Sequence, residues 1–336
     1  ASSITQNTSW TIDRTGTTSK FRAVAYGDSI YAGYNGSIFN VDKRSATWVQ
    51  AEYLSTAWNA DMEVMRRTKS GAKADEIYNS KIVGERSFMQ TANTRLVAYE
   101  MCGNDFLQAR SAFNDQTGVC NLAVIDNALA TCTNFHNLAM DAINQYANPA
   151  ALKMVMNLYY PGYAADNVLT NCTINGARVN KQDAFITRIA RSNYRVCNTA
   201  RAKGFVCVDA FADWMGADYD SNGDGKVDSE ALRFSPDETE EQYVTRISQT
   251  LRSTVRDSNN HLVDPSTSFD YLLSDDTHPT FSGSTLSTGF FGGTASGTSG
   301  PDFSNSQIVG GKNPIFNRFG HERLGWLHSL FHRASP

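Results

Sequence analysis

The sequence lacks several features that define whole classes of protein. None of its apolar runs is long enough to cross a bilayer, so we expect no integral membrane segment. It has no basic run interleaved with aromatic residues, and its net charge is −4, so nucleic acid is not an expected partner. No two cysteines have the CxxC spacing, so the common zinc and redox motifs are absent.

What the sequence does contain is an even set of cysteines in a composition typical of a folded soluble protein, with 41% hydrophobic and 19% charged residues. The six are Cys102, Cys120, Cys132, Cys172, Cys197 and Cys207. We favour disulfides over buried thiols, which implies an oxidising compartment. The chain begins with Ala1 and carries no signal peptide. We therefore expect a secreted or periplasmic protein whose signal has been removed, with no pairing of the cysteines preferred.

Apolar runs alternate with segments of helical spacing along most of the chain. We expect strands at 21–26, 61–66, 94–101, 151–160 and 204–210, and helices at 46–57, 122–146, 182–202 and 239–256. Strands separated by helices predict a mostly parallel sheet covered on both faces. Residues 1–20 are polar and are expected to form an N-terminal arm, followed by a single domain over 21–336.

Chemically useful side chains follow two of these strands. Ser29 comes just after strand 21–26, and Asn104 just after strand 94–101. In an open parallel sheet, ligands collect at the carboxyl ends of the strands, so both side chains are expected to face one crevice. A serine becomes a good nucleophile when a base removes its proton, and His278 is the candidate base. Asp275, three residues earlier, would orient that imidazole.

The remaining requirement of acyl transfer is a set of donors for the developing oxyanion. We expect three: the backbone N–H of Ser29, the backbone N–H of Gly71 and the side-chain amide of Asn104. Together with the Ser29, His278 and Asp275 triad, they predict an enzyme that needs no cofactor for its chemistry.

Four short segments, in this order, resemble the conserved blocks of the SGNH (GDSL) hydrolase family of esterases and lipases. They are Gly27-Asp28-Ser29-Ile30, Ser70-Gly71-Ala72, Gly103-Asn104-Asp105 and Asp275-Asp276-Thr277-His278-Pro279. The resemblance implies an α/β fold, a three-layer α/β/α sandwich with a mostly parallel, flavodoxin-like sheet. It also implies that Ser29 is the nucleophile, that Gly71 and Asn104 serve the oxyanion, and that Asp275 and His278 complete the triad.

One departure from the family pattern follows the histidine. A stretch rich in Gly and Ser, residues 282–312, separates His278 from a segment at 320–327 that resembles the family's C-terminal helix. We expect this insertion to be either a lid or pocket wall that presents Phe290 and Phe291, or an ordinary surface loop.

A second unusual segment, at 218–231, resembles the start of an EF-hand or dockerin-type calcium loop. The oxygen donors at ligand spacing are Asp220, Asn222, Asp224, the Lys226 carbonyl and Asp228, with Glu230 one residue before the usual last ligand position. Clustered oxygen donors of this kind repel one another without a cation. We therefore predict structural Ca²⁺ rather than a metal-free turn.

Taken together, these patterns predict a secreted serine esterase that hydrolyses lipid or small acyl esters through an acyl-Ser29 intermediate. Two alternatives stay open. One is a carbohydrate O-acetylesterase, which would use the same residues. The other is a calcium-stabilised binding or adhesion module with an inert hydrolase fold. The expected partner is a small-molecule or lipid ester, and the sequence identifies no protein partner.

Overall fold

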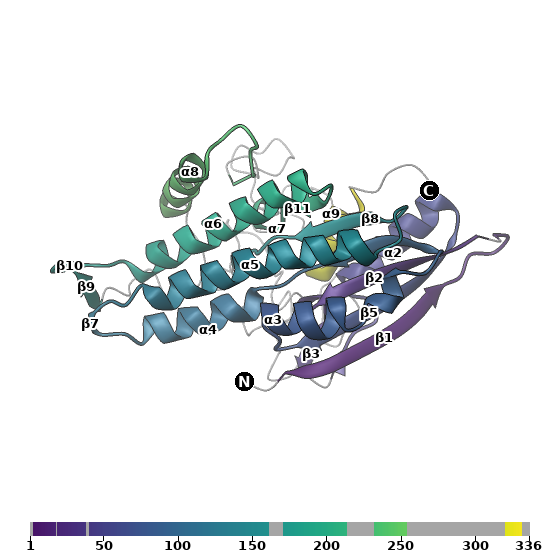
Figure 1. Cartoon of the computed structure of the whole chain (residues 1–336), viewed down its shortest axis with the longest axis horizontal. Helices are drawn as coiled ribbons and strands as arrows, with labels where there is room; N and C mark the ends of the chain where they lie inside the picture. Colours follow the sequence, from purple (N-terminus) through teal and green to yellow (C-terminus); the bar gives the residue numbers. More distant parts are fainter. Residues whose placement is uncertain are drawn as a thin grey trace, which may run out of the picture.

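A computed structural model describes residues 3–17, 19–37, 40–160, 171–213, 232–253 and 320–330 of the chain (Figure 1). Several sequence predictions lie outside these residues. They are Asp275 and His278, the calcium-like loop at 218–231 and the insertion at 282–312.

The central sheet is mostly parallel and has the order β1-β5-β2-β6-β8-β11 among the described residues. Its strands are β1 (Ile4–Ile12), β2 (Lys20–Gly27), β5 (Asp61–Ser70), β6 (Thr94–Tyr99), β8 (Leu152–Met156) and β11 (Val206–Val208). From β5 to β11 every neighbouring pair is parallel. In chain order these five strands follow the flavodoxin-like pattern 2-1-3-4-5, with a topological switch point between β2 and β6. The predicted fold class is thereby confirmed.

Helices cover both faces of this sheet, as Figure 1 shows. One face carries α4 (Gly103–Asn114), α5 (Ala123–Tyr146) and α6 (Lys181–Ala202), with α8 (Glu240–Ser253) outside α6; the other carries α2 (Ala46–Trp58) and α9 (Gly320–Ser329). Successive side chains of a strand point to opposite faces. In β2, Val24 and Tyr26 therefore join the core under α4–α6, while Ala23 and Ala25 join the core under α2.

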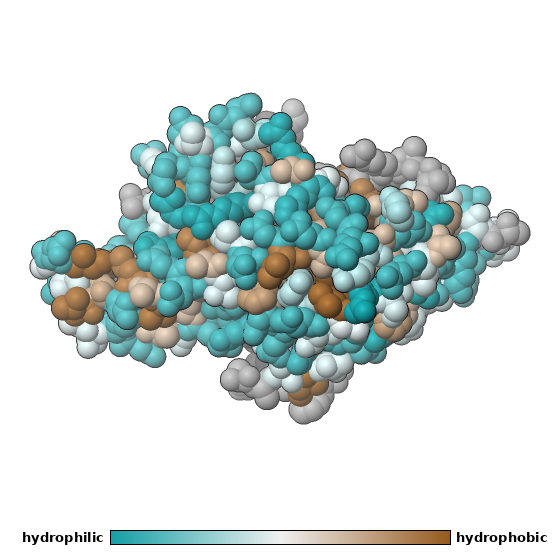
Figure 2. All heavy atoms as spheres, in the orientation of Figure 1, coloured by the Kyte–Doolittle hydropathy of each residue, from teal (hydrophilic) through white to brown (hydrophobic). Residues whose placement is uncertain are grey.

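The remaining described elements are short connections. They are α1 (Ser29–Ala32), β3 (Tyr34–Ser37), β4 (Asn40–Val41), α3 (Ala74–Glu76), a π-helical segment (Ile77–Val83), a 3₁₀ turn (Arg86–Met89), β7 (Gly118–Val119), β9 (Cys172–Ile174), β10 (Ala177–Arg178) and α7 (Ala210–Asp213). Strand β9 lies between β7 and β10 in a small separate sheet. Figure 2 shows hydrophobic residues gathered at that end of the molecule, where Val119 is 80% exposed.

Residues 1–20, predicted to be a polar arm, include a strand of the main sheet. β1 pairs antiparallel with β5 from Ile4 opposite Ser70 to Ile12 opposite Met62. Exposed and half-buried positions alternate along most of it, which is the period of a strand with one covered face. The inward positions include polar Gln6 and Thr8, so the sequence shows little apolar alternation there. The Gln6 carbonyl accepts the Thr68 hydroxyl, which fixes the strand to β5.

Helix α8 shows how a predicted boundary is set. In the structure the Thr239 hydroxyl accepts the Gln242 N–H at 3.2 Å, and the Gln242 side chain accepts the Thr239 N–H at 2.9 Å. This reciprocal pair is a capping box, and it places the start of the helix after Thr239.

All six cysteines are in disulfides, as expected. The pairs are Cys102–Cys132, Cys120–Cys172 and Cys197–Cys207. They join the start of α4 to α5, the end of β7 to β9, and α6 to β11. The pairing is compatible with an oxidising compartment. Among the described helices, none is long and apolar enough to cross a membrane.

Helix α9 packs directly on α2 through a glycine. A β-carbon on Gly325 would lie 2.4 Å from the Val49 Cβ and 2.7 Å from the Ala46 carbonyl oxygen. The Ala46 N–H donates to Nδ1 of buried His321, and Nε2 of buried His328 lies 2.7 Å from the Tyr31 hydroxyl. The C-terminal helix is thus held against α2 and against α1, the turn that follows β2.

We expect Gly325→Ala to destabilise the protein by about 1–3 kcal/mol, because the added methyl group has no space between the two helices. The measurement is urea unfolding of the variant beside the wild type. An unchanged unfolding free energy for this variant would show that the two helices are not packed this closely.

Candidate active site

Ser29 lies where β2 ends and α1 begins. Its side chain is in a buried setting, with the residue 7% exposed, and it lines a cavity. The preceding Asp28 caps α1, because its Oδ1 accepts the Ile30 N–H at 2.9 Å. The serine is therefore presented on a fixed turn at the carboxyl end of a parallel strand.

The far end of this turn is held by buried Arg66 of β5. Its guanidinium donates to the Ala32 carbonyl at 3.1 Å and to the Asp42 carbonyl at 2.6 Å, and its Nε donates to Thr47. Burial lowers the pKa of Arg66 to about 9. The guanidinium thus donates hydrogen bonds to two carbonyl oxygens of the chain at and after the end of α1. These bonds fix the position of the turn relative to β5.

Asn104 lies in the first turn of α4, just after β6. Its Nδ2 donates to the Ala72 carbonyl at 2.9 Å and to Asp28 Oδ2 at 3.3 Å. Gly103 allows this approach, because a β-carbon there would be 3.1 Å from Asp28 Oδ2. β2 and β6 are neighbours in the sheet, so Ser29 and Asn104 meet at its switch point.

Gly71 lies in the turn after β5, the strand on the other side of β2. Its φ is +78°, a left-handed conformation that favours glycine. The next residue, Ala72, supplies the carbonyl that holds the Asn104 amide. The predicted second block is thus brought beside the third. Donation by the Gly71 N–H to an oxyanion stays a prediction, as do the roles of Asp275 and His278.

The cavity that Ser29 lines runs between α4 and α6 and encloses about 80 Å³. Apart from Ser29, Asp28, Glu100, Gly103 and Asn104, its described walls are mainly apolar: Ile30, Phe106, Leu107, Met156, Leu158, Tyr159, Tyr160, Phe185 and Ile189. The aromatic rings of Phe106 and Tyr160 both pack on the ring of Phe185. A polar end at the strand edge therefore leads into an apolar space.

Sequence reasoning missed Glu100, the first residue after β6. It is 2% exposed and its Oε1 accepts the Asp28 N–H at 2.6 Å. Burial, and then the charge of Asp28, raise the pKa of Glu100 well above its usual range. In the sequence it is one acidic residue after an apolar run, and it lies outside the four segments that resemble the family's blocks.

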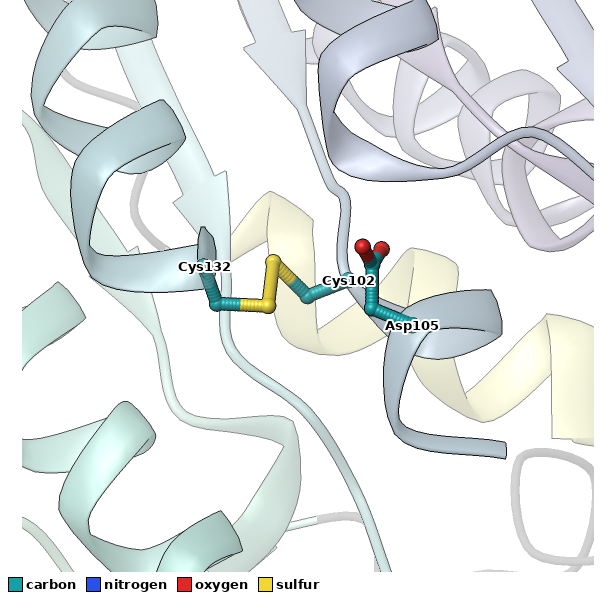
Figure 3. Close-up of side chains that lie close together, drawn as sticks. All are labelled: Cys102, Asp105 and Cys132. Carbon is teal, nitrogen blue, oxygen red and sulfur yellow. A yellow bond between two sulfur atoms is a disulfide. The ribbon is translucent and has the colours of Figure 1, made fainter. Parts of the chain in front are cut away.

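Figure 3 shows a cluster beside the site that could be mistaken for a metal centre. Asp105, in the first turn of α4, lies close to the sulfur atoms of Cys102 and Cys132. The two sulfurs are bonded to each other, so they are not thiolate ligands. The Asp105 carboxylate instead accepts the Ala74 N–H at 2.9 Å, which joins α4 to α3.

Two of the described histidines, His136 and His328, are packing residues. His136 and His328 are buried, and burial lowers their pKa values to about 3 and about 4. The Tyr99 hydroxyl contacts the ring of His136, and the Tyr31 hydroxyl contacts the ring of His328. Neither histidine is among the described residues that line the Ser29 cavity.

No family model matches the chain, and no curated protein matches it. Among solved structures, it is similar to the lipase Lip_vut3 from a goat rumen metagenome, with 16% identity, a TM-score of 0.45, and 69% of this chain and 96% of that chain covered. It is also similar to a lipase/acylhydrolase from Enterococcus faecalis (14% identity, TM-score 0.36, 69% and 95% covered). A third is the acetyl xylan esterase AlAXEase (12% identity, TM-score 0.38, 69% and 100% covered). These likenesses are too distant to assign an activity.

The setting of Asp105 generates a pH prediction. Burial raises its pKa from the ordinary 3.8 to about 6. Between those values the folded chain holds a proton that the unfolded chain has released, so stability falls as pH rises through this window. Two pKa units correspond to about 3 kcal/mol. We expect Asp105→Asn, which keeps an oxygen for the Ala74 N–H, to remove this fall.

Urea unfolding at a series of pH values checks this expectation. The difference in unfolding free energy, variant minus wild type, should grow between about pH 4 and pH 6 and then level off. Parallel curves for the two proteins would mean that Asp105 titrates normally.

Proposed function

We propose that this chain is a serine hydrolase that cleaves carboxylic esters through an acyl-Ser29 intermediate. The observation that carries the proposal is the meeting of Ser29 and Asn104 at the carboxyl ends of the adjacent strands β2 and β6. Both line one cavity with a mainly apolar wall. The motif order and the predicted Asp275 and His278 supply the rest of the machinery, by resemblance to the SGNH family.

The proposed reaction has two halves. His278 takes the proton of the Ser29 hydroxyl as its oxygen attacks the ester carbonyl, and Asp275 stabilises the imidazolium that forms. The tetrahedral oxyanion receives N–H donors from Ser29, Gly71 and Asn104. His278 then protonates the leaving alcohol. Water repeats the sequence on the acyl-enzyme, releasing the acid, and no cofactor is required.

In this reaction Asn104 must offer one of its amide hydrogens to the oxyanion, and its present contacts indicate which one. Its amide nitrogen has two hydrogens, and in the structure these are directed to Ala72 and Asp28. The Ala72 bond is short and fixes the side chain, whereas the Asp28 contact, at 3.3 Å, is long. The second hydrogen, whose contact with Asp28 is long, is therefore the one that we expect the oxyanion to share when substrate binds.

The walls of the cavity favour an aliphatic acyl group. An acetyl group would occupy only the polar end, next to Ser29. The side chains beyond it, such as Leu107, Phe185 and Ile189, are apolar and suit a longer chain. This supports an ester with an aliphatic acyl group over a carbohydrate acetate, whose sugar would need polar partners.

Secretion and calcium binding are further parts of the proposal. The three disulfides support an oxidising compartment. The calcium-like loop at 218–231 lies outside the described residues, so structural Ca²⁺ stays a prediction from the sequence.

We expect Ser29→Ala to abolish hydrolysis of a short aryl ester while the melting temperature changes little, because the lost hydroxyl is small and lies at the cavity. His278→Ala should cause a similar loss, since the triad acts as a unit. The measurement is turnover of p-nitrophenyl esters by the full chain. Equal turnover by wild type and Ser29→Ala would contradict the proposal and favour a non-catalytic binding module.

We expect Leu107→Trp to lower kcat/KM for long-chain esters more than for acetyl esters, because the larger side chain fills the apolar part of the cavity. Leu107 is half-buried, so the ring can be accommodated at the rim. The matched control is Gln108→Trp, the same substitution at an exposed position of the same helix. If both variants keep the wild-type chain-length profile, the acyl chain binds elsewhere.

A further inference from the structure

A buried pair of carboxyl groups, Glu100 and Asp28, lies directly behind the proposed nucleophile. Each residue is 2% exposed, and both line the cavity that Ser29 lines. Glu100 Oε1 accepts the Asp28 N–H, and the two side chains also share a hydrogen bond. Gly27 makes this possible, since a β-carbon there would lie 2.3 Å from Glu100 Oε1.

Two carboxylates at hydrogen-bonding distance in a buried place do not both stay ionised, so the pair shares one proton. Both groups accept hydrogen bonds, Glu100 from the backbone N–H groups of Asp28 and Tyr31, so the contacts together with burial and charge indicate which group holds it. Asp28 accepts hydrogen bonds on both oxygens, from the Ile30 N–H and from Asn104 Nδ2, as a carboxylate does. The pKa of Glu100 is raised well above its usual range, first by burial and then by the charge of Asp28.

We propose that Glu100 is a positioning residue that keeps its proton and donates a hydrogen bond to the Asp28 carboxylate, so that the Ser29 turn and the Asn104 amide stay in register for acyl transfer. This inference rests on the proposed function of Ser29 and Asn104. The proton has two effects. It compensates part of the negative charge of Asp28. It thereby weakens the hydrogen bond between Asp28 and the second Asn104 hydrogen, which is the hydrogen that the oxyanion needs.

The matched substitutions are Glu100→Gln and Glu100→Leu. A glutamine has the shape of a protonated glutamic acid, and it offers both an oxygen to the Asp28 N–H and an N–H to the Asp28 carboxylate. We expect it to keep most of kcat. Leucine keeps the bulk but makes neither bond, and we expect kcat to fall on the order of 10²-fold, with KM for a p-nitrophenyl ester changed far less.

The alkaline side of the pH profile separates positioning from packing. In the wild type, kcat should fall at high pH as Glu100 loses its proton beside Asp28. In Glu100→Gln that fall should be absent. The neighbouring hydroxyls of Tyr31 and Tyr99 do not cause it, because burial raises both pKa values well above the ordinary 10.0. Glu63→Gln is the control, since Glu63 pairs with Arg22 and should leave the profile unchanged.

A thermal measurement tests the proton without any assay of activity. An acid whose pKa is higher in the folded chain loses its stabilising contribution as pH rises from the unfolded to the folded pKa. The melting temperature of Glu100→Gln, relative to wild type, should therefore increase with pH above the ordinary glutamate range. If the melting temperatures of the two proteins change with pH in parallel, Glu100 does not hold an extra proton in the folded chain, and the proposal is overturned.

The outcomes also separate this inference from the function on which it rests. Ester turnover that depends on Ser29, but is lost equally in Glu100→Gln and Glu100→Leu, would overturn the positioning role and leave the hydrolase intact. Turnover that is absent or indifferent to Ser29→Ala would overturn the proposed function and the catalytic part of this inference. In that case the melting curves still decide whether Glu100 is protonated.

Discussion

The candidate site depends on the two hydrogen bonds that the Asp28 carboxylate accepts. One oxygen holds the N–H that starts α1, and the other meets the Asn104 amide from the next strand along the sheet. A buried charge needs such partners, because its desolvation is otherwise costly. The hydrogen bond between Asp28 and Asn104 can form only because β2 lies beside β6. The geometry of the site therefore depends on the strand order. Two glycines, Gly27 and Gly103, leave the space in which these groups approach.

The rest of the structure supports this junction from both sides. Arg66 holds the chain that leaves α1, and α9 contacts the same short helix through the pair of Tyr31 and His328. On the opposite face, the Cys102–Cys132 disulfide joins the start of α4 to α5. Rigid supports of this kind suit a site whose geometry must be set before substrate arrives. The apolar cavity follows from the same packing, because it lies between α4 and α6.

Much of the fold could be read from apolar periodicity. The long helices α5 and α6 begin and end within one residue of their expected bounds, because their buried positions recur at helical spacing. Strand β8 is shorter than expected, at Leu152–Met156, since the apolar run continues past the sheet into the cavity wall at Tyr159 and Tyr160. β1 was missed because two of its inward positions, Gln6 and Thr8, are polar and interrupt the apolar alternation. For such a strand, pairing with β5 rather than hydrophobicity supplies the signal.

By itself the sequence determined the layered α/β class and the identity of the chemical groups at two strand ends, Ser29 and Asn104, because periodicity and short motifs are local properties. The tertiary structure decided which strands are neighbours, how the six cysteines pair, and that Glu100 is buried against Asp28. These depend on contacts between residues far apart in the chain, whose free energy exists only once the sheet has formed. Nothing in the residues next to Glu100 in the sequence indicates that it will lie against the carboxylate of Asp28.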